Sequence, residues 1–365
     1  MQKKEVSTLT SWPGFLDQPF PAGMRQIQIM RLFLYLIFPF FLACESVSQH
    51  YLGDKINGVC FVAPRDSVGE QTMVSVKSIS AGWVAIVPYA FSLEEDPIVN
   101  YRLEGKWWGE TKEGVEHTVR YAKSLGLKVM LKPHVWIRRQ GWPGDFNLKT
   151  EEEWQQWEQS YTEYLDIMTD IAVSENVEMI CIGTEYRIPA RERPDFWRKL
   201  SKRIRERYAG KLTYAANWDN FEYITFWDEL DFIGIDAYFP LSDKKNPSVK
   251  ELLNHWEEPL ELIEEVREEY NKPILFTEYG YRSADFASRG HWHNEEEGLV
   301  KNMEAQKTAY EALYQTFWHQ PWFAGGFLWK WYPFVNRESR WDRWETDFTP
   351  QEKSTEEVIK HYYSR

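Results

Sequence analysis

Short apolar runs alternate with longer amphipathic stretches from about residue 56 to the C-terminus. The runs are rich in Val, Ile, Ala and Phe, and they are too short and too uniformly apolar for amphipathic helices. They therefore predict strands that are buried on both faces. Eight such strands are expected, at residues 58–63, 83–88, 128–134, 179–183, 211–216, 232–236, 274–277 and 326–329.

The stretches between these runs show helical spacing and helix-ending residues. Thr150 and Glu153 form a capping-box pattern before one helix, and Gly126 follows another as a C-cap. Helices are expected at residues 71–79, 110–125, 151–174, 194–208, 221–227, 248–270, 298–319 and 351–362. A strand followed by a helix, repeated eight times, predicts an α/β protein whose parallel sheet closes into a (β/α)8 TIM barrel. The barrel is expected as a single domain over residues 56–365.

The first 44 residues do not fit this pattern and are typical of an export segment. Arg25 and Arg31 precede an apolar run at residues 32–42 that is too short to span a bilayer. Ala43 and Cys44 follow, and this order resembles a bacterial lipoprotein signal. The resemblance implies cleavage before Cys44, lipidation of that cysteine and anchoring to a membrane.

An ordinary signal peptide or a single anchor helix is the alternative interpretation of this segment. Residues 1–23 fit no signal, so Met24 is a candidate start of the chain and the residues before it are a candidate upstream artefact. Residues 45–55 are polar and are expected to form a linker between the export segment and the barrel.

The charge and the aromatic content of the chain limit the classes of molecule that it is expected to bind. The net charge is −13 and no basic cluster lies outside the N-terminal segment, which excludes nucleic acid as a partner. The 19 Trp residues could be core, but Trp rings also stack on sugar faces, and so many favour a carbohydrate cleft. Cys60 and Cys181 lie in predicted strands as small hydrophobes, and no Cys and His spacing indicates a metal.

Polar and aromatic side chains gather where the predicted strands end. In a (β/α)8 barrel the functional residues lie at the carboxyl ends of the strands, so these side chains are expected to share one mouth. The candidate site residues are Arg65, His134, Trp136, Thr184, Glu185, Asn217, Trp218, Asp236, Tyr238, Glu278, Tyr279 and Trp329. Carboxyl groups among aromatic platforms predict a site for sugars.

Glu185 and Glu278 each end an apolar strand, where a carboxyl is costly unless it is paired or used. Cleavage of a glycosidic bond needs one protonated carboxyl and one ionised carboxylate. The fourth and seventh strands lie on opposite sides of a barrel mouth, so the two side chains can face each other. A separation of about 5–5.5 Å between the carboxyls would give retention of configuration.

The sequence around these glutamates resembles glycoside hydrolase clan A and is most similar to family 113, known mainly for β-mannanases. The resemblance covers roughly residues 57–348, and its motifs are residues 181–185, 232–238 and 276–280. It implies that Glu185 is the acid/base and Glu278 the nucleophile. It also implies that Tyr238 orients the nucleophile and that Trp329 forms the floor of the subsite for the reacting sugar.

One position departs from the clan pattern. Many clan A enzymes carry Asn directly before the acid/base, where it hydrogen-bonds the sugar 2-OH, but this chain has Thr184. The shorter hydroxyl leaves this role to another group, such as Asn217 or His134. Because mannose has an axial 2-OH, this position bears on the substrate.

Several candidates also have an ordinary structural explanation. Asp236 either binds substrate, caps a helix or braces Lys330, and His134 is either a ligand contact or a buried core histidine. Arg65 either holds the nucleophile ionised or pairs within a loop. Trp136, Trp142 and Trp218 are either packing residues or sugar platforms. His291 and His293 lie before an acidic run like metal ligands, but that run more simply begins a helix.

The sequence thus predicts a retaining, endo-acting glycoside hydrolase that is exported and lipid-anchored. The expected substrate is β-mannan or a related β-1,4 polysaccharide, the expected state is a monomer, and no cofactor is implied. Two alternatives stay open: a clan A hydrolase for β-glucan or an amino-sugar polymer, and a non-catalytic glycan-binding lipoprotein.

Overall fold

A computed structural model describes residues 51, 53–69, 71–101, 106–138, 142–290, 298–335 and 344–365. By its contacts the chain divides into two units, Met1–Ser46 and Val47–Arg365, and only the second contains described residues. The proposed export segment and Cys44 therefore lie outside them. Within the described ranges, no helix is long and apolar enough to cross a membrane.

Eight parallel strands close into a barrel, which confirms the predicted (β/α)8 fold. Their order around the barrel is β1-β10-β9-β8-β7-β6-β4-β2, and β1 pairs with both β2 and β10 to close it. The strands are β1 (Ile56–Val62), β2 (Trp83–Val87), β4 (Lys128–Leu131), β6 (Met179–Thr184), β7 (Lys211–Asn217), β8 (Ile233–Asp236), β9 (Ile274–Tyr279) and β10 (Phe323–Trp331).

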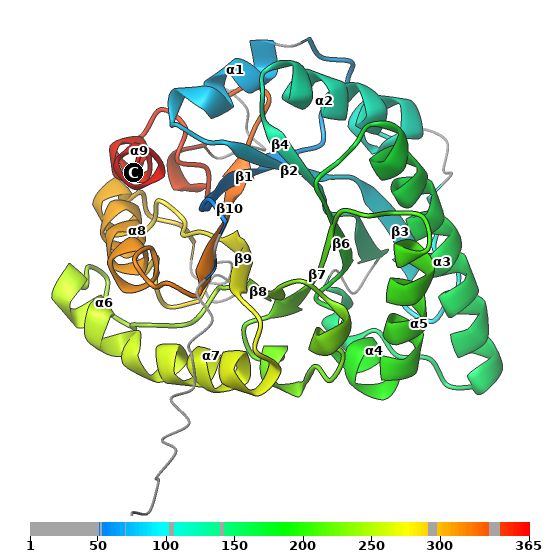
Figure 1. The fold of residues 1–365 in the computed structure, drawn as a ribbon. Coiled ribbons are helices and arrows are strands. Elements are labelled where there is room, and N and C mark those ends of the chain that lie inside the picture. Colours follow the sequence, from blue (N-terminus) through cyan, green and yellow to red (C-terminus); the bar gives the residue numbers. More distant parts are fainter. Residues whose placement is uncertain are drawn as a thin grey trace, which may run out of the picture. The chain divides into compact units, whose positions relative to one another are not determined.

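Helices surround the barrel as an outer layer (Figure 1). Between these helices and the strands lies the larger apolar core, and a smaller cluster that includes Cys60, Ala85, Met130 and Cys181 fills the barrel interior. The helices are α1 (Gln71–Ser78), α2 (Lys112–Ser124), α3 (Glu151–Ser174), α4 (Arg187–Glu192), α5 (Pro194–Arg205), α6 (Val249–His255), α7 (Glu257–Tyr270), α8 (Met303–Phe317) and α9 (Thr355–Tyr363).

Helix boundaries differ from the prediction where a backbone hydrogen bond is missing or where a side chain caps the helix. The helix expected over residues 248–270 is split into α6 and α7 at Trp256, because Pro259 has no N–H for the carbonyl of residue 255. Helix α8 begins only at Met303, where the Asn302 side chain accepts from the N–H of Ala305. The helix expected over 221–227 consists of separate 3-10 turns, and the short helix α4 was not predicted.

The loops after the second and third barrel strands hold a feature that the sequence pattern did not reveal. Residues Tyr89–Leu93 (β3) and His134–Arg138 (β5) pair as a separate two-stranded parallel sheet. The expected strand 128–134 is therefore two strands, interrupted at Pro133, which lacks a backbone donor. This small sheet places His134 and Trp136 beside the mouth of the barrel.

Candidate active site

The carboxyl ends of the barrel strands surround a cavity of about 670 Å³. Both predicted glutamates line it, from β6 and β9, together with His134, Thr184, Asn217 and Tyr238. Its aromatic walls comprise Tyr89, Trp136, Trp142, Trp218, Trp329 and Phe348. The cavity thus combines the two glutamate carboxyls with flat rings, as a sugar site requires.

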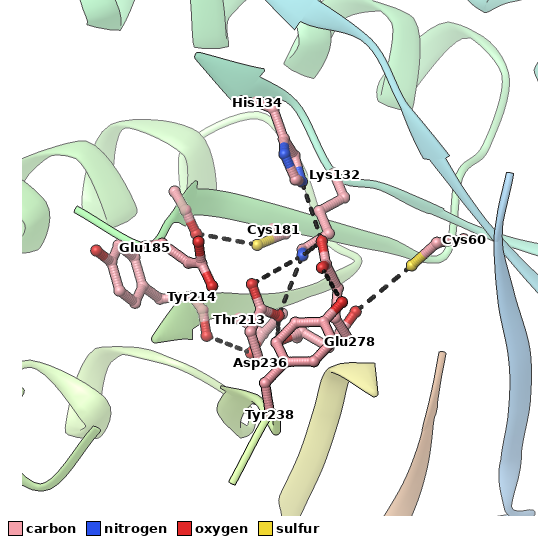
Figure 2. A network of polar contacts seen from close by, with 12 residues as sticks. Cys60, Lys132, His134, Cys181, Glu185, Thr213, Tyr214, Asp236, Tyr238 and Glu278 are labelled. Carbon is pink, nitrogen blue, oxygen red and sulfur yellow. Dashed lines mark hydrogen bonds and ion pairs between the residues drawn. The ribbon is translucent and has the colours of Figure 1, made fainter. Parts of the chain in front are cut away.

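Glu278 lies on the floor of this cavity and is only 5% exposed. The Tyr238 hydroxyl donates to its Oε2 at 2.8 Å, which is the contact implied for an orienting tyrosine. The Lys132 ammonium donates to Oε1, and His134 Nε2 lies 3.4 Å from the same oxygen. Figure 2 shows the three side chains converging on this carboxylate.

Lys132 is the residue of this network that the sequence analysis missed. It is fully buried, and its Nζ lies 3.1 and 3.2 Å from the two carboxylate oxygens of Asp236. Met130 points into the barrel, so strand alternation turns Lys132 inward as well. The sequence did offer one indication of this role: Lys132 is a lysine at the carboxyl end of an apolar strand, at a position where alternation turns its side chain into the barrel.

Asp236 is a supporting residue and not a substrate contact. It is fully buried and does not line the cavity, and the Thr277 hydroxyl donates to its Oδ1 at 2.7 Å. The expectation that it binds substrate is therefore corrected, and it braces Lys132. Lys330, its expected partner, lies 3.6 Å from Asp347 instead.

The surroundings of Glu278 hold it ionised. Burial would raise the pKa of this carboxyl, but the charge of Lys132, the nearby His134 Nε2 and the hydrogen bond from Lys132 lower it to about 2. Burial lowers the pKa of His134, with the Lys132 charge acting in the same direction, so this imidazole is neutral at neutral pH. The positive charge beside Glu278 therefore comes from Lys132.

Glu185 lies where β6 ends and the chain turns sharply. Its φ of 54° is uncommon for a residue other than glycine, and its N–H donates to the Ala215 carbonyl at 2.8 Å. The side chain is partly exposed to the cavity. Its Oε2 accepts a hydrogen bond of 2.8 Å from the indole Nε1 of Trp142.

Burial raises the pKa of Glu185 well above its usual value, and the negative charges of Asp236 and Glu278 raise it further. Lys132 and the Trp142 hydrogen bond oppose this shift without cancelling it. Glu185 therefore holds a proton under conditions in which Glu278 is ionised. One carboxyl can act as an acid while the other acts as a nucleophile or base.

The remaining predicted residues divide between the cavity and other places. Trp136, Trp218, Trp329, Thr184 and Asn217 line the cavity. The buried Thr184 hydroxyl has no hydrogen-bond partner of normal geometry among the described residues, apart from its contact with the Cys181 thiol.

Besides Asp236, two predicted residues lie away from the cavity. Arg65 is exposed and does not line it. Tyr279 is fully buried on the helix side of β9, where its hydroxyl bonds Tyr314 at 3.1 Å and Tyr363 at 2.7 Å. Tyr279 is thus a core residue, because adjacent residues of a strand point to opposite faces.

Metal ligation has no support in the part of the chain that the structure describes. No group of three His, Cys, Asp or Glu side chains there is arranged to hold an ion. His291 and His293 lie outside the described residues.

A protonated and an ionised carboxyl that share an aromatic cavity at a barrel mouth define the class of protein: a glycoside hydrolase. The chain belongs to Glycoside Hydrolase Family 113, whose model matches residues 65–353. This confirms the resemblance seen in the sequence, and it makes the substrate a polysaccharide or oligosaccharide.

Solved structures of the same family are similar over nearly their whole length. The GH113 β-mannanase AaManA from Alicyclobacillus acidocaldarius, in complex with ManMIm, is 25% identical with a TM-score of 0.74, over 87% of this chain and 99% of that one. A GH113 β-1,4-mannanase is 26% identical with a TM-score of 0.74, over 86% and 99%.

More distant structures share the fold alone. A β-glucuronidase from an uncultured Clostridium sp. is 15% identical with a TM-score of 0.59, over 85% of this chain and 50% of that one. None of the curated proteins compared with the chain matches it.

Proposed function

We propose that this protein is a retaining, endo-acting β-1,4-mannanase in which Glu278 is the nucleophile and Glu185 the acid/base. The observation that carries the proposal is that two carboxyls line one cavity with different contacts: Glu278 accepts from Lys132 and Tyr238, which favours its ionised form, and the pKa of Glu185 is raised by burial and by the charges of Asp236 and Glu278. A double displacement requires this arrangement at its first step.

In the first step Glu278 attacks the anomeric carbon while Glu185 gives its proton to the glycosidic oxygen. The bond between that oxygen and the anomeric carbon breaks, and a covalent glycosyl-enzyme forms. In the second step the ionised Glu185 takes a proton from water, and the water oxygen displaces Glu278 from the anomeric carbon. Lys132 and Tyr238 contact the Glu278 carboxylate and would stabilise it as it leaves.

The substrate and the endo pattern are supported by the family and by the cavity. Similar solved structures are described as a β-mannanase and a β-1,4-mannanase, and this chain matches 99% of the length of each. Rings spread around the cavity, such as Trp136, Trp218 and Trp329, would stack on several sugars of a chain. Thr184 offers a small hydroxyl beside Glu185, where an axial 2-OH needs room.

The proposal is tested by hydrolysis of mannan, glucomannan, cellulose and chitosan by the wild type and Glu278→Gln. Mannan is expected to be cleaved into oligosaccharides of mixed length, and Glu278→Gln to lose at least about 10⁴-fold in kcat while still binding mannan. Early proton NMR spectra should show the retained anomer. An inverted anomer, or equal inertness of both proteins, would overturn the mechanism.

Glu185→Ala separates the two roles. It is expected to be slow on polymer and to gain turnover with added azide, which can attack the glycosyl-enzyme without a base. If azide accelerates Glu278→Ala in place of Glu185→Ala, the two assignments are exchanged.

We also propose that the protein is exported and anchored through a lipid on Cys44. The support is the order of Arg31, the apolar run and Ala43 before that cysteine. In a bacterial host, the wild type should incorporate labelled palmitate and be recovered in the membrane fraction. Cys44→Ser should incorporate no label and be released from membranes. Release of both proteins would contradict the anchor.

A further inference from the structure

Trp142 lines the cavity and contacts the proposed acid/base, Glu185. It lies in the loop after β5 and precedes the 3-10 turn Pro143–Asp145. Its indole Nε1 donates to Glu185 Oε2 at 2.8 Å. The sequence pattern alone could not distinguish a packing role from a sugar platform, and neither interpretation includes this hydrogen bond.

The indole ring is held in place from two elements. The Arg187 guanidinium, at the start of α4, lies 5.0 Å from the ring centroid. Arg187 in turn pairs with Asp145, and its Nη1 lies 3.7 Å from Asp219. On the loop itself, a Cβ at Gly144 would overlap the indole ring, so only glycine lets the ring lie where it does.

An indole N–H donates and cannot accept. When Glu185 is a carboxylic acid, its carbonyl oxygen is a better acceptor than its hydroxyl oxygen, so the oxygen facing Trp142 is the carbonyl. Resting on the proposed function, we infer that Trp142 is a positioning residue that places the catalytic proton of Glu185 on Oε1. The Oε1 hydroxyl then faces the glycosidic oxygen of the bound sugar chain.

The same contact serves the second step. Once Glu185 is ionised, the bond from Trp142 to Oε2 becomes charge-assisted and stronger. Oε1 is again the free oxygen, and it takes the proton from the attacking water. Trp142 therefore favours the ionised form, and it selects the same oxygen in both directions of proton transfer.

Trp142→Phe tests the inference, because it keeps an aromatic ring and removes the N–H. Two substrates are compared: a manno-oligosaccharide, whose departing sugar needs a proton, and a 2,4-dinitrophenyl β-mannobioside, whose leaving group does not. We expect kcat/KM on the oligosaccharide to fall about 10- to 150-fold, as for loss of a hydrogen bond to a charged group. The value on the dinitrophenyl substrate should change far less, and the basic limb of the pH profile should move to higher pH.

The ratio of kcat/KM on the oligosaccharide to kcat/KM on the dinitrophenyl substrate does not change when part of the protein is unfolded, because both values fall by the same factor. Gly144→Ala, which displaces the indole ring, should change that ratio in the same direction. Trp136→Phe is the matched control, because it makes the same chemical change in the same cavity at a ring that is 47% exposed. It should affect both substrates by the same factor.

Equal losses on the two substrates in Trp142→Phe, or an unmoved basic limb, would overturn the inference. Glu185→Ala shows whether the proposed function itself fails. If Glu185→Ala shows no dependence on the leaving group, the acid/base assignment is wrong. If the loss in Glu185→Ala depends on the leaving group and the loss in Trp142→Phe does not, the acid/base assignment stands and only the role inferred for Trp142 is wrong.

Discussion

The floor of the cavity around Glu278 and its wall around Glu185 are opposite environments for the same side chain. Glu278 is nearly inaccessible, yet it contacts the Lys132 ammonium and accepts hydrogen bonds, which lower its pKa to about 2. Glu185 is more open to the cavity, yet burial and the negative charges of Asp236 and Glu278 raise its pKa, and neither Lys132 nor the Trp142 hydrogen bond cancels this shift. Partners, and not burial alone, therefore decide which carboxyl is ionised.

Replacing Lys132, the cation beside Glu278, should abolish the difference in pKa between the two glutamates. In Lys132→Met the buried Glu278 loses its counter-charge, so burial raises its pKa and the acid limb of kcat/KM moves to higher pH. We expect a loss of at least about 100-fold at neutral pH. Removing one partner of a buried ion pair should also cost about 3–5 kcal/mol in unfolding free energy.

The matched control is Lys149→Met, which removes an exposed lysine paired with the exposed Glu95. It should leave the unfolding free energy close to the wild-type value and the pH profile unmoved, because an exposed ion pair contributes little to stability. Urea titrations and pH profiles measure both proteins. An acid limb that stays at its wild-type position in Lys132→Met would show that Lys132 does not hold Glu278 ionised.

Loss of the second contact of the floor should have a smaller effect. Tyr238→Phe removes the 2.8 Å hydrogen bond to Glu278 Oε2. We expect kcat/KM to fall about 10- to 150-fold, which corresponds to about 1.5–3 kcal/mol for a bond to a charged group. Steady-state kinetics on manno-oligosaccharides measures the change.

Tyr279→Phe makes the same change one residue from Glu278, on the opposite face of β9. Its hydroxyl bonds Tyr314 and Tyr363 in the core, so the variant should lose stability and keep near-normal kcat/KM. A catalytic loss in Tyr279→Phe as large as that in Tyr238→Phe would contradict the separation of the two faces.

The barrel and its strand ends could be predicted because they depend on local pattern. Apolar runs and caps identify the strands and α3, and the carboxyl ends of parallel strands share one mouth. Tyr279 could not be excluded in this way, because the pairing register shifts between Phe276 and Glu278 and this irregularity, which the apolar pattern does not show, turns Glu278 inward and Tyr279 outward.

The support around the two glutamates could not be predicted in the same way. The Lys132 contacts to Asp236 and Glu278 span 104 and 146 residues of sequence. The contact of Trp142 with Glu185 spans 43 residues, and Trp142 follows β5, whose pairing with β3 the apolar pattern does not reveal. Arg65 follows a strand as the other candidates do, but its side chain is exposed and does not line the cavity.

The smallest effect is expected where floor and wall are coupled through charge. Burial and the charge of Glu278 raise the pKa of Asp236 to about 7, although Lys132 opposes them. As Asp236 ionises, its negative charge raises the pKa of Glu185. Asp236→Asn keeps an oxygen for Lys132 and Thr277 but removes that charge, so the basic limb of kcat/KM should move to lower pH, opposite to the shift expected for Trp142→Phe. If the basic limb of kcat/KM stays in place in Asp236→Asn, the Asp236 charge does not contribute to the raised pKa of Glu185. Burial and the charge of Glu278 would then be sufficient to keep Glu185 protonated.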